Sequence, residues 1–81
     1  MFYVYVLQSE INDSIYLGYT SDLRKRLTEH NNGRNISTKK NAPWELIYYE
    51  SYQNRKLAMA REKQLKRHAK SYAMLKKRIG L

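Results

Sequence analysis

The chain has 81 residues, enough for one small domain with a thin core. It contains no cysteine, which excludes a disulfide scaffold and thiolate metal sites. The apolar N-terminal run FYVYVL is too short for a membrane span and lacks the basic flank of a signal peptide. We therefore expect a single domain over residues 1–81 that is cytoplasmic and has no membrane partner.

The net charge of +9 is concentrated in the C-terminal third of the chain. Residues 1–53 contain six basic and six acidic side chains, whereas residues 54–81 contain ten basic side chains and one acidic side chain, Glu62. A basic segment of this kind favours a polyanionic partner, nucleic acid first, through phosphate neutralisation and counterion release. The alternatives are a solvated helical surface that keeps the protein in solution and, more remotely, an anionic membrane.

Two segments near the N-terminus predict strands. Residues 2–8 and 15–19 are rich in β-branched and aromatic residues, and the first segment is apolar on both faces, as is typical of a central strand. Asn12-Asp13 predicts a two-residue turn in which paired residue numbers sum to 25. Because that sum is odd, Tyr5 and Tyr16 are predicted to lie on the same face of the sheet.

The rest of the chain predicts helices and one more strand. One of residues 20–22 (Thr, Ser, Asp) can cap a helix that ends near residue 31, before an Asn-Gly pair. Residues 34–43 predict a flexible loop with at most a short helical turn. Residues 44–52 predict a strand, residues 54–67 a helix capped by Asn54, and residues 69–79 a last helix. The order β-β-α-β-α-α indicates an α+β fold with a small antiparallel sheet.

Several residues in the first half of the chain could carry chemistry. Seven of the eight tyrosines lie in or beside predicted strands, where their apolar rings and polar tips account for most of them. On the first predicted helix, Arg26 and His30 share a face with two leucines. Each residue alone is ordinary at a packed boundary, but a guanidinium also binds phosphate through two parallel hydrogen bonds.

Glu62 is the only carboxylate in its basic segment. An ion pair with Arg55, Lys66 or Arg67 would contribute about 0.3–0.5 kcal/mol and needs no function. As an oxygen ligand it could instead hold one Mg²⁺, which often binds one or two carboxylates and keeps several waters. The residues alone favour the ion pair.

Phosphodiester hydrolysis would give these residues a common purpose. It needs a base that activates water, a cation that faces the phosphate oxygens and help for the departing oxygen. Tyr5 or Tyr16 could supply the base, Arg26 the cation and Glu62 a metal ion. A tyrosine has an ordinary pKa of about 10, so it needs nearby positive charge or a proton acceptor such as His30. Spacing alone fits a binding module equally well.

Ordered motifs along nearly the whole chain resemble the GIY-YIG endonuclease family, in particular its small single-domain bacterial branch. Tyr3-Val4-Tyr5 and Tyr16-Leu17-Gly18 are similar to the two motifs of the family name, and the step from Tyr5 to Tyr16 fits its spacing. The stretch D-L-R-K-R-L, with His30 four residues after Arg26, is similar to the catalytic helix of the family. The segment A-R-E-K-Q-L-K is similar to the region that supplies its metal-binding glutamate.

The resemblance implies a fold and an activity. The fold is a three-stranded antiparallel sheet flanked by helices, and the activity is that of a metal-dependent DNA endonuclease with a role in DNA repair or processing. One Mg²⁺ or Mn²⁺ ion is the implied cofactor. The implied site consists of Tyr5 as general base, Tyr16 as a group that orients the water, Arg26 on the scissile phosphate, His30 in support of the tyrosines, Glu62 on the metal, and Gly18 where the backbone is closely approached.

The expected partner is nucleic acid, most simply DNA. Since the larger relatives carry an appended DNA-binding domain and this sequence shows none, we expect an activity that is weak, nonspecific or dependent on a protein partner that supplies specificity. Two alternatives stay open: a noncatalytic nucleic-acid-binding protein that retains the fold, and an accessory subunit. The basic residues expected to contact the nucleic-acid backbone are Lys39, Lys40, Lys63, Lys66, Arg67 and Lys70.

Overall fold

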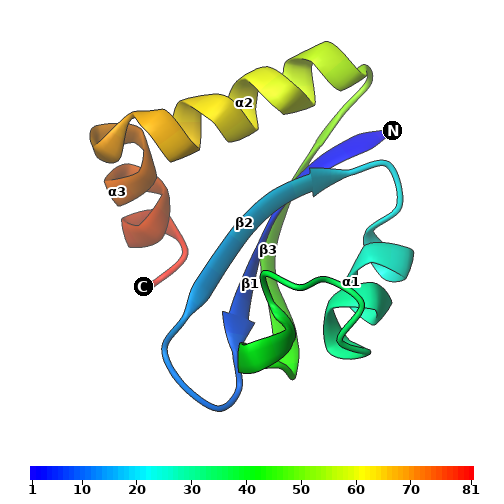
Figure 1. Cartoon of the computed structure of the whole chain (residues 1–81). Coiled ribbons are helices and arrows are strands. Elements are labelled where there is room, and N and C mark those ends of the chain that lie inside the picture. Colours follow the sequence, from blue (N-terminus) through cyan, green and yellow to red (C-terminus); the bar gives the residue numbers. More distant parts are fainter.

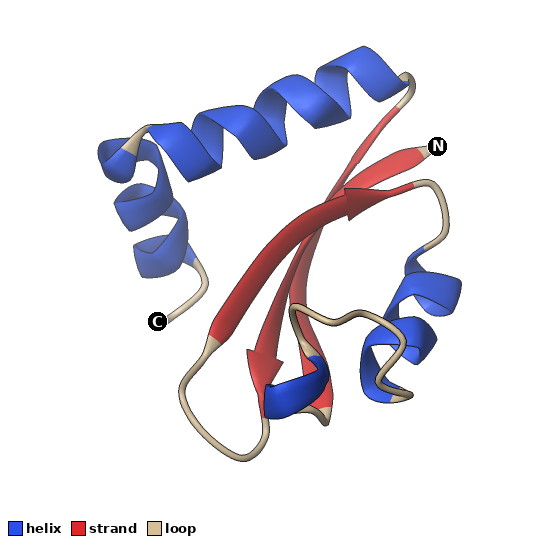
Figure 2. Ribbon diagram, viewed as in Figure 1, coloured by secondary structure: helices blue, strands red, loops and turns tan.

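The structure, a computed structural model, describes all 81 residues. Its strands are β1 (Phe2–Ser9), β2 (Ile15–Thr20) and β3 (Trp44–Tyr52), and its helices are α1 (Leu23–Asn31), α2 (Arg55–Arg67) and α3 (Ala69–Arg78). One turn of 3₁₀ helix, η1 (Lys39–Asn41), precedes β3. Figures 1 and 2 show the strands as a twisted sheet with the helices around it. The predicted α+β fold and its element order are confirmed. None of the helices has the length and apolar character to cross a membrane.

The three strands form one antiparallel sheet in the order β2-β1-β3. Residues 4–7 of β1 are buried, because this central strand is covered on both faces. On one face, Val4 and Val6 pack in a cluster with Leu65 of α2 and Leu75 of α3. On the other face, a cluster around Tyr5 packs against α1 and the start of β3. The prediction of a central first strand is therefore confirmed.

The predicted two-residue turn at Asn12-Asp13 is wrong. Tyr5 pairs with Gly18, so paired numbers sum to 23 and residues 10–14 form a wider connection. The hydroxyl of Ser9 accepts hydrogen bonds from the backbone N–H groups of Ile11 and Asn12, which replaces the tight turn with a broader loop. Because the sum remains odd, Tyr5 and Tyr16 still lie on one face, as predicted.

Side-chain caps fix where the first two helices begin. The carboxylate of Asp22 accepts from the backbone N–H of Lys25 at 3.0 Å, so Asp22 is the cap of α1 and Thr20 ends β2 instead. The amide oxygen of Asn54 accepts from the N–H of Leu57, as predicted for α2. These caps satisfy N–H groups that have no partner within the helix.

Candidate active site

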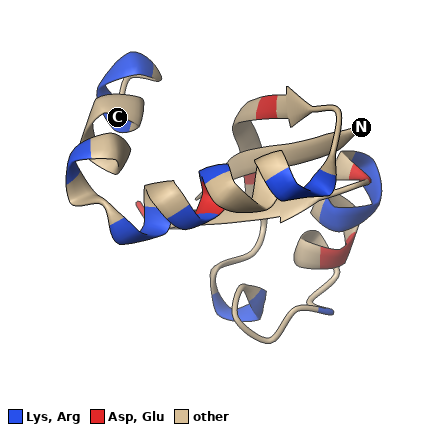
Figure 3. Ribbon diagram, turned by 90° about the horizontal axis from the view of Figure 1, so that it is seen from above, with Lys and Arg blue, Asp and Glu red and all other residues tan.

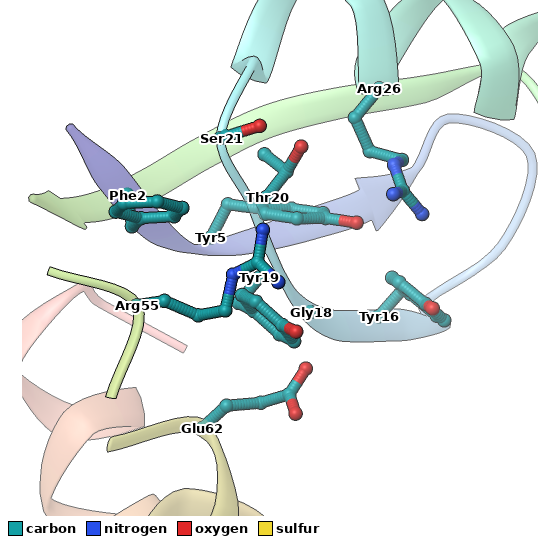
Figure 4. A pocket seen from close by; sticks show the side chains of 10 residues that line it. All are labelled: Phe2, Tyr5, Tyr16, Gly18, Tyr19, Thr20, Ser21, Arg26, Arg55 and Glu62. Atoms are coloured by element: carbon teal, nitrogen blue, oxygen red, sulfur yellow. The ribbon is translucent and has the colours of Figure 1, made fainter. Parts of the chain in front are cut away.

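A cavity of about 330 Å³ lies where α1, α2 and the first two strands meet. In Figure 4, Arg26 enters from α1 above and Glu62 from α2 below, with the side chains of Tyr5 and Tyr16 between them. Gly18 also lines this cavity. Five of the site residues predicted from the sequence therefore lie around one cavity. They come from four different elements, so only the tertiary fold brings them together.

Gly18 leaves the space that the ring of Tyr5 occupies. A β-carbon at position 18 would stand 2.6 Å from the hydroxyl oxygen of Tyr5 and 2.8 Å from its Cζ atom. The backbone angle φ of Gly18 is not positive, so its role lies in this close approach and not in backbone freedom. The group that closely approaches the backbone of Gly18 is therefore the side chain of Tyr5.

The rings of Tyr5, Tyr16 and His30 pack against one another. Ring centroids lie 6.3 Å apart for Tyr5 and Tyr16 and 4.8 Å apart for Tyr16 and His30. The hydroxyl oxygen of Tyr5 lies 2.9 Å from Nε2 of His30, within hydrogen-bond distance. Burial, with a smaller effect of Tyr16, raises the pKa of Tyr5 above its ordinary value, although Arg26 opposes this. Tyr5 is therefore a neutral phenol at rest.

His30 is fully buried and does not line the cavity. Burial lowers the pKa of His30 below its ordinary value of 6.5, and the positive charge of Arg26 lowers it further. A neutral imidazole has one N–H donor and one acceptor nitrogen. His30 is thus able to accept one proton from a neighbour on the cavity side.

Both charged residues predicted for the site hold surface ion pairs. Nε of Arg26 lies 3.5 Å from a carboxylate oxygen of Glu29, and Nζ of Lys66 lies 3.5 Å from a carboxylate oxygen of Glu62. The ion pair that the residues alone favoured for Glu62 is therefore present. Glu62 also lines the cavity. Exposed pairs of this kind are worth only ~0–1 kcal/mol, so a phosphate or a divalent cation can compete with them.

Arg55 also lines the cavity, although the sequence suggested only an ion pair for it. Its guanidinium carbon lies 5.5 Å from the centre of the Phe2 ring, and its side chain extends into the cavity between Tyr5 and Glu62 (Figure 4). Arg55 precedes Glu62 by seven residues, which is about two turns and places both on one helix face. This spacing from Glu62 is the feature of the sequence that could have identified Arg55 as a site residue. Phe2, Tyr19, Thr20 and Ser21 complete the lining.

The expected nucleic-acid-binding residues are all exposed, but they do not lie together. Lys39 and Lys40 belong to η1, at the opposite end of the sheet from α2 (Figure 1). Figure 3 shows the other basic positions spread along α2 and α3, among which one acidic position of α2 stands out. Of these basic residues, Lys66 lies next to the cavity, because its Nζ is 3.5 Å from the carboxylate of the lining residue Glu62.

Comparison with known proteins places this arrangement in a family. Residues 1–78 match the sequence model of the GIY-YIG catalytic domain. The chain belongs to the GIY-YIG family. It is 38% identical over 68 residues to a UPF0213 protein of Clostridium perfringens, covering 83% of this chain and 72% of that protein. A UPF0213 protein of Pediococcus pentosaceus is 42% identical over 71 residues, covering 86% and 74% of the two chains.

A solved structure supports the same assignment for this GIY-YIG chain. The solution NMR structure of a UPF0213 protein from Bacillus halodurans matches 93% of this chain and 83% of its own, with a TM-score of 0.53 and 28% sequence identity. The predicted family is therefore confirmed. GIY-YIG proteins form a nuclease superfamily, whereas the names of these three UPF0213 relatives state no activity.

GIY-YIG nucleases generally use divalent metal ions, and the donors at this cavity fit such an ion. No group of three or more His, Asp or Glu side chains could enclose a metal. The cavity instead offers the single carboxylate of Glu62, whose side chain is 19% exposed, and three tyrosine hydroxyls line the same cavity. Mg²⁺ prefers oxygen donors and commonly keeps waters beside one or two carboxylates and a substrate phosphate. Glu62 is the residue that would hold it.

Proposed function

We propose that this GIY-YIG protein is a metal-dependent DNA endonuclease that hydrolyses phosphodiester bonds, with a role in DNA repair or processing. The observation that carries the proposal is the shared cavity. It gathers a phenol with a proton acceptor behind it, two guanidinium groups and a carboxylate. These are the groups that activation of water, neutralisation of a phosphate and stabilisation of a departing oxygen require.

Tyr5 and His30 act together as the base. Because burial raises the pKa of Tyr5, a free phenolate is unfavourable. Tyr5 therefore takes a proton from the attacking water at its oxygen while its own proton moves to Nε2 of His30, 2.9 Å away. Tyr5 stays neutral, and His30 holds the proton only transiently, because burial and Arg26 lower its pKa and disfavour the imidazolium. Tyr16, whose ring packs on both partners, orients the water.

The phosphate is held by guanidinium groups. Arg26 binds the non-bridging oxygens of the scissile phosphate, and Arg55 binds a neighbouring phosphate of the same strand from the α2 side of the cavity. The water oxygen bonds to phosphorus as the bond to the departing sugar oxygen breaks, and solvent then protonates that oxygen. Glu62 would hold a divalent ion, which would supply positive charge that stabilises the departing oxygen.

Nicking of supercoiled plasmid in Mg²⁺ or Mn²⁺ tests this proposal. Tyr5→Phe, Arg26→Ala and Glu62→Gln should each lower the nicking rate by about 100-fold or more. The three substitutions remove the general base, a phosphate ligand and the metal ligand, respectively. Glu45→Gln, at an exposed position of β3, is the matched control and keeps wild-type activity. Chelation of the metal ion also stops the reaction.

Equal nicking by the wild type and the three site variants would show that the activity is a contaminant and would refute the proposal. A noncatalytic nucleic-acid-binding protein is the second candidate, favoured by the ion pair between Glu62 and Lys66. It predicts no cleavage and equal or tighter DNA binding by Glu62→Ala, because that change removes a negative charge. Binding measured beside nicking therefore separates the two functions.

A further inference from the structure

Thr38 is a fully buried polar residue to which the sequence assigned no role. It lies in the segment between α1 and η1, where a flexible loop was expected. Its hydroxyl oxygen Oγ1 lies 2.7 Å from Nδ1 of His30, on the opposite side of the imidazole from Tyr5. The imidazole is therefore held between a phenol and a threonine hydroxyl, both of which are buried.

The backbone of Thr38 is fixed on several sides. Its N–H donates to the carbonyl of Asn35 at 3.1 Å, and its own carbonyl accepts from the indole Nε1–H of Trp44 at 2.9 Å and from the N–H of Asn41 at 3.2 Å. Trp44 is itself only 4% exposed and starts β3. Oγ1 of Thr38 thus has a set position relative to the sheet, and the segment is not free to move it away from His30.

The hydrogen atoms of this cluster can be placed by counting donors and acceptors. Oγ1 of Thr38 lies 3.4 Å from the carbonyl oxygen of Asn35, which can only accept. When the threonine hydroxyl donates there, its oxygen accepts from Nδ1–H of His30. Nε2 then carries a lone pair and accepts the hydroxyl hydrogen of Tyr5. Every hydrogen has an acceptor along one chain, from Tyr5 through His30 and Thr38 to the carbonyl of Asn35.

The direction of this chain decides what the oxygen of Tyr5 can do. In the direction above, its lone pairs face the cavity and can receive a proton. In the opposite direction, Nε2–H would donate to Tyr5, and the phenol hydrogen would point into the cavity. The contact between Thr38 and Asn35 would then lack a hydrogen, because the threonine has only one to give.

We propose that Thr38 is a positioning residue that holds His30 in the tautomer with hydrogen on Nδ1, and so leaves Nε2 free to accept the proton of Tyr5. This role rests on the nuclease function proposed above, whereas the tautomer is a property of the folded protein alone. A hydrogen-bond partner behind an imidazole generally sets which of its nitrogens carries the proton.

Nitrogen-15 NMR of the histidine rings tests the inference without any substrate. At a pH above the ordinary histidine pKa of about 6.5, His30 of the wild type should be protonated on Nδ1. Thr38→Val keeps the shape and removes Oγ1, so His30 should shift towards the tautomer protonated on Nε2. Thr38→Ser keeps Oγ1 and should retain the wild-type tautomer, and the exposed His68 should be unchanged in all three proteins.

Cleavage measured on the same proteins completes the test. Thr38→Val should cleave about 10- to 100-fold more slowly than the wild type, the range seen when the hydrogen-bond partners of metal-binding histidines are removed, and Thr38→Ser should recover most of the loss. Wild-type His30 protonated on Nε2, or a folded Thr38→Val protein with an unchanged tautomer, would overturn the inference. The expected tautomers without cleavage by any protein would overturn only the proposed nuclease function.

Discussion

Arg61 of α2 grips the carboxylate of Glu50 on β3 through two hydrogen bonds, of 2.9 Å from Nε and 3.1 Å from the terminal nitrogen Nη2. The hydroxyls of Tyr48 and Tyr52 donate to the same carboxylate. This cluster attaches α2 to the sheet one residue before Glu62. The position of the proposed metal ligand thus depends on an ion pair outside the cavity.

Glu50→Gln should lower the free energy of unfolding by about 2 kcal/mol, because charged hydrogen bonds to a largely buried carboxylate are lost. Urea denaturation measures the change. Glu29→Gln is the matched control: Glu29 pairs with Arg26 at 3.5 Å on the surface, so its loss should cost ~0.5 kcal/mol or less. Equal effects of the two substitutions would contradict a special role for the cluster.

Gly18→Ala should destabilise the protein by about 1–3 kcal/mol, because the new methyl group would overlap the buried ring of Tyr5. It should also displace the Tyr5 hydroxyl from His30 and slow cleavage. The double variant Gly18→Ala/Tyr5→Phe removes the nearest overlapping atom, so its unfolding free energy should be higher than additivity predicts. Strict additivity in this cycle would show that the two residues do not compete for space.

Stability should depend on pH through His30. The folded-state pKa of His30 is lowered from 6.5 by burial and by Arg26. As the pH falls, His30 therefore binds a proton in the unfolded chain before it does so in the folded protein. Stability is therefore complete above pH 6.5 and falls as the pH drops below it, with a slope of at most about 1.4 kcal/mol per pH unit. His30→Gln should remove this slope, and His68→Gln should retain it. Chemical denaturation at a series of pH values above and below 6.5 measures the slope in both variants.

Glu50 adds a second, more acidic window. Burial alone would raise its pKa, but hydrogen bonds from Arg61, Tyr52 and Tyr48 together lower it below its ordinary 4.5. The contribution of the Glu50 carboxylate to stability is therefore fully present above pH 4.5 and is lost as the pH falls below that value. The loss of stability below pH 4.5 should be smaller in Glu50→Gln, while the step that begins at pH 6.5 remains.

Arg55→Ala should weaken DNA binding by removing one phosphate contact. The slope of log K against log salt concentration should become shallower by about 0.9 on duplex DNA or about 0.7 on single strands. Lys56→Ala removes the same charge from the next residue, which does not line the cavity, and should change the slope less. Fluorescence anisotropy across a salt series provides the measurement. An equal change in both variants would assign the effect to net charge alone.

The sequence predicted the features that depend on near neighbours. The cap at Asn54, the first cap within residues 20–22 and the central place of the first strand follow from residue chemistry over a few positions. The connection after β1 was predicted wrongly, because the hydroxyl of Ser9 bonds to the backbone of Ile11 and Asn12 and widens the loop. Thr38 was missed because nothing in a polar loop sequence signals a buried hydroxyl.

By itself, the sequence determined which residues could react and which faces they share, since the periods of strands and helices are set by local backbone geometry. It placed Tyr5 with Tyr16 and Arg26 with His30. Only the tertiary structure decided that these pairs meet Glu62 and Arg55 around one cavity and that Thr38 closes behind His30. Such meetings depend on strand register and helix packing, which result from many weak contacts between residues far apart in the chain.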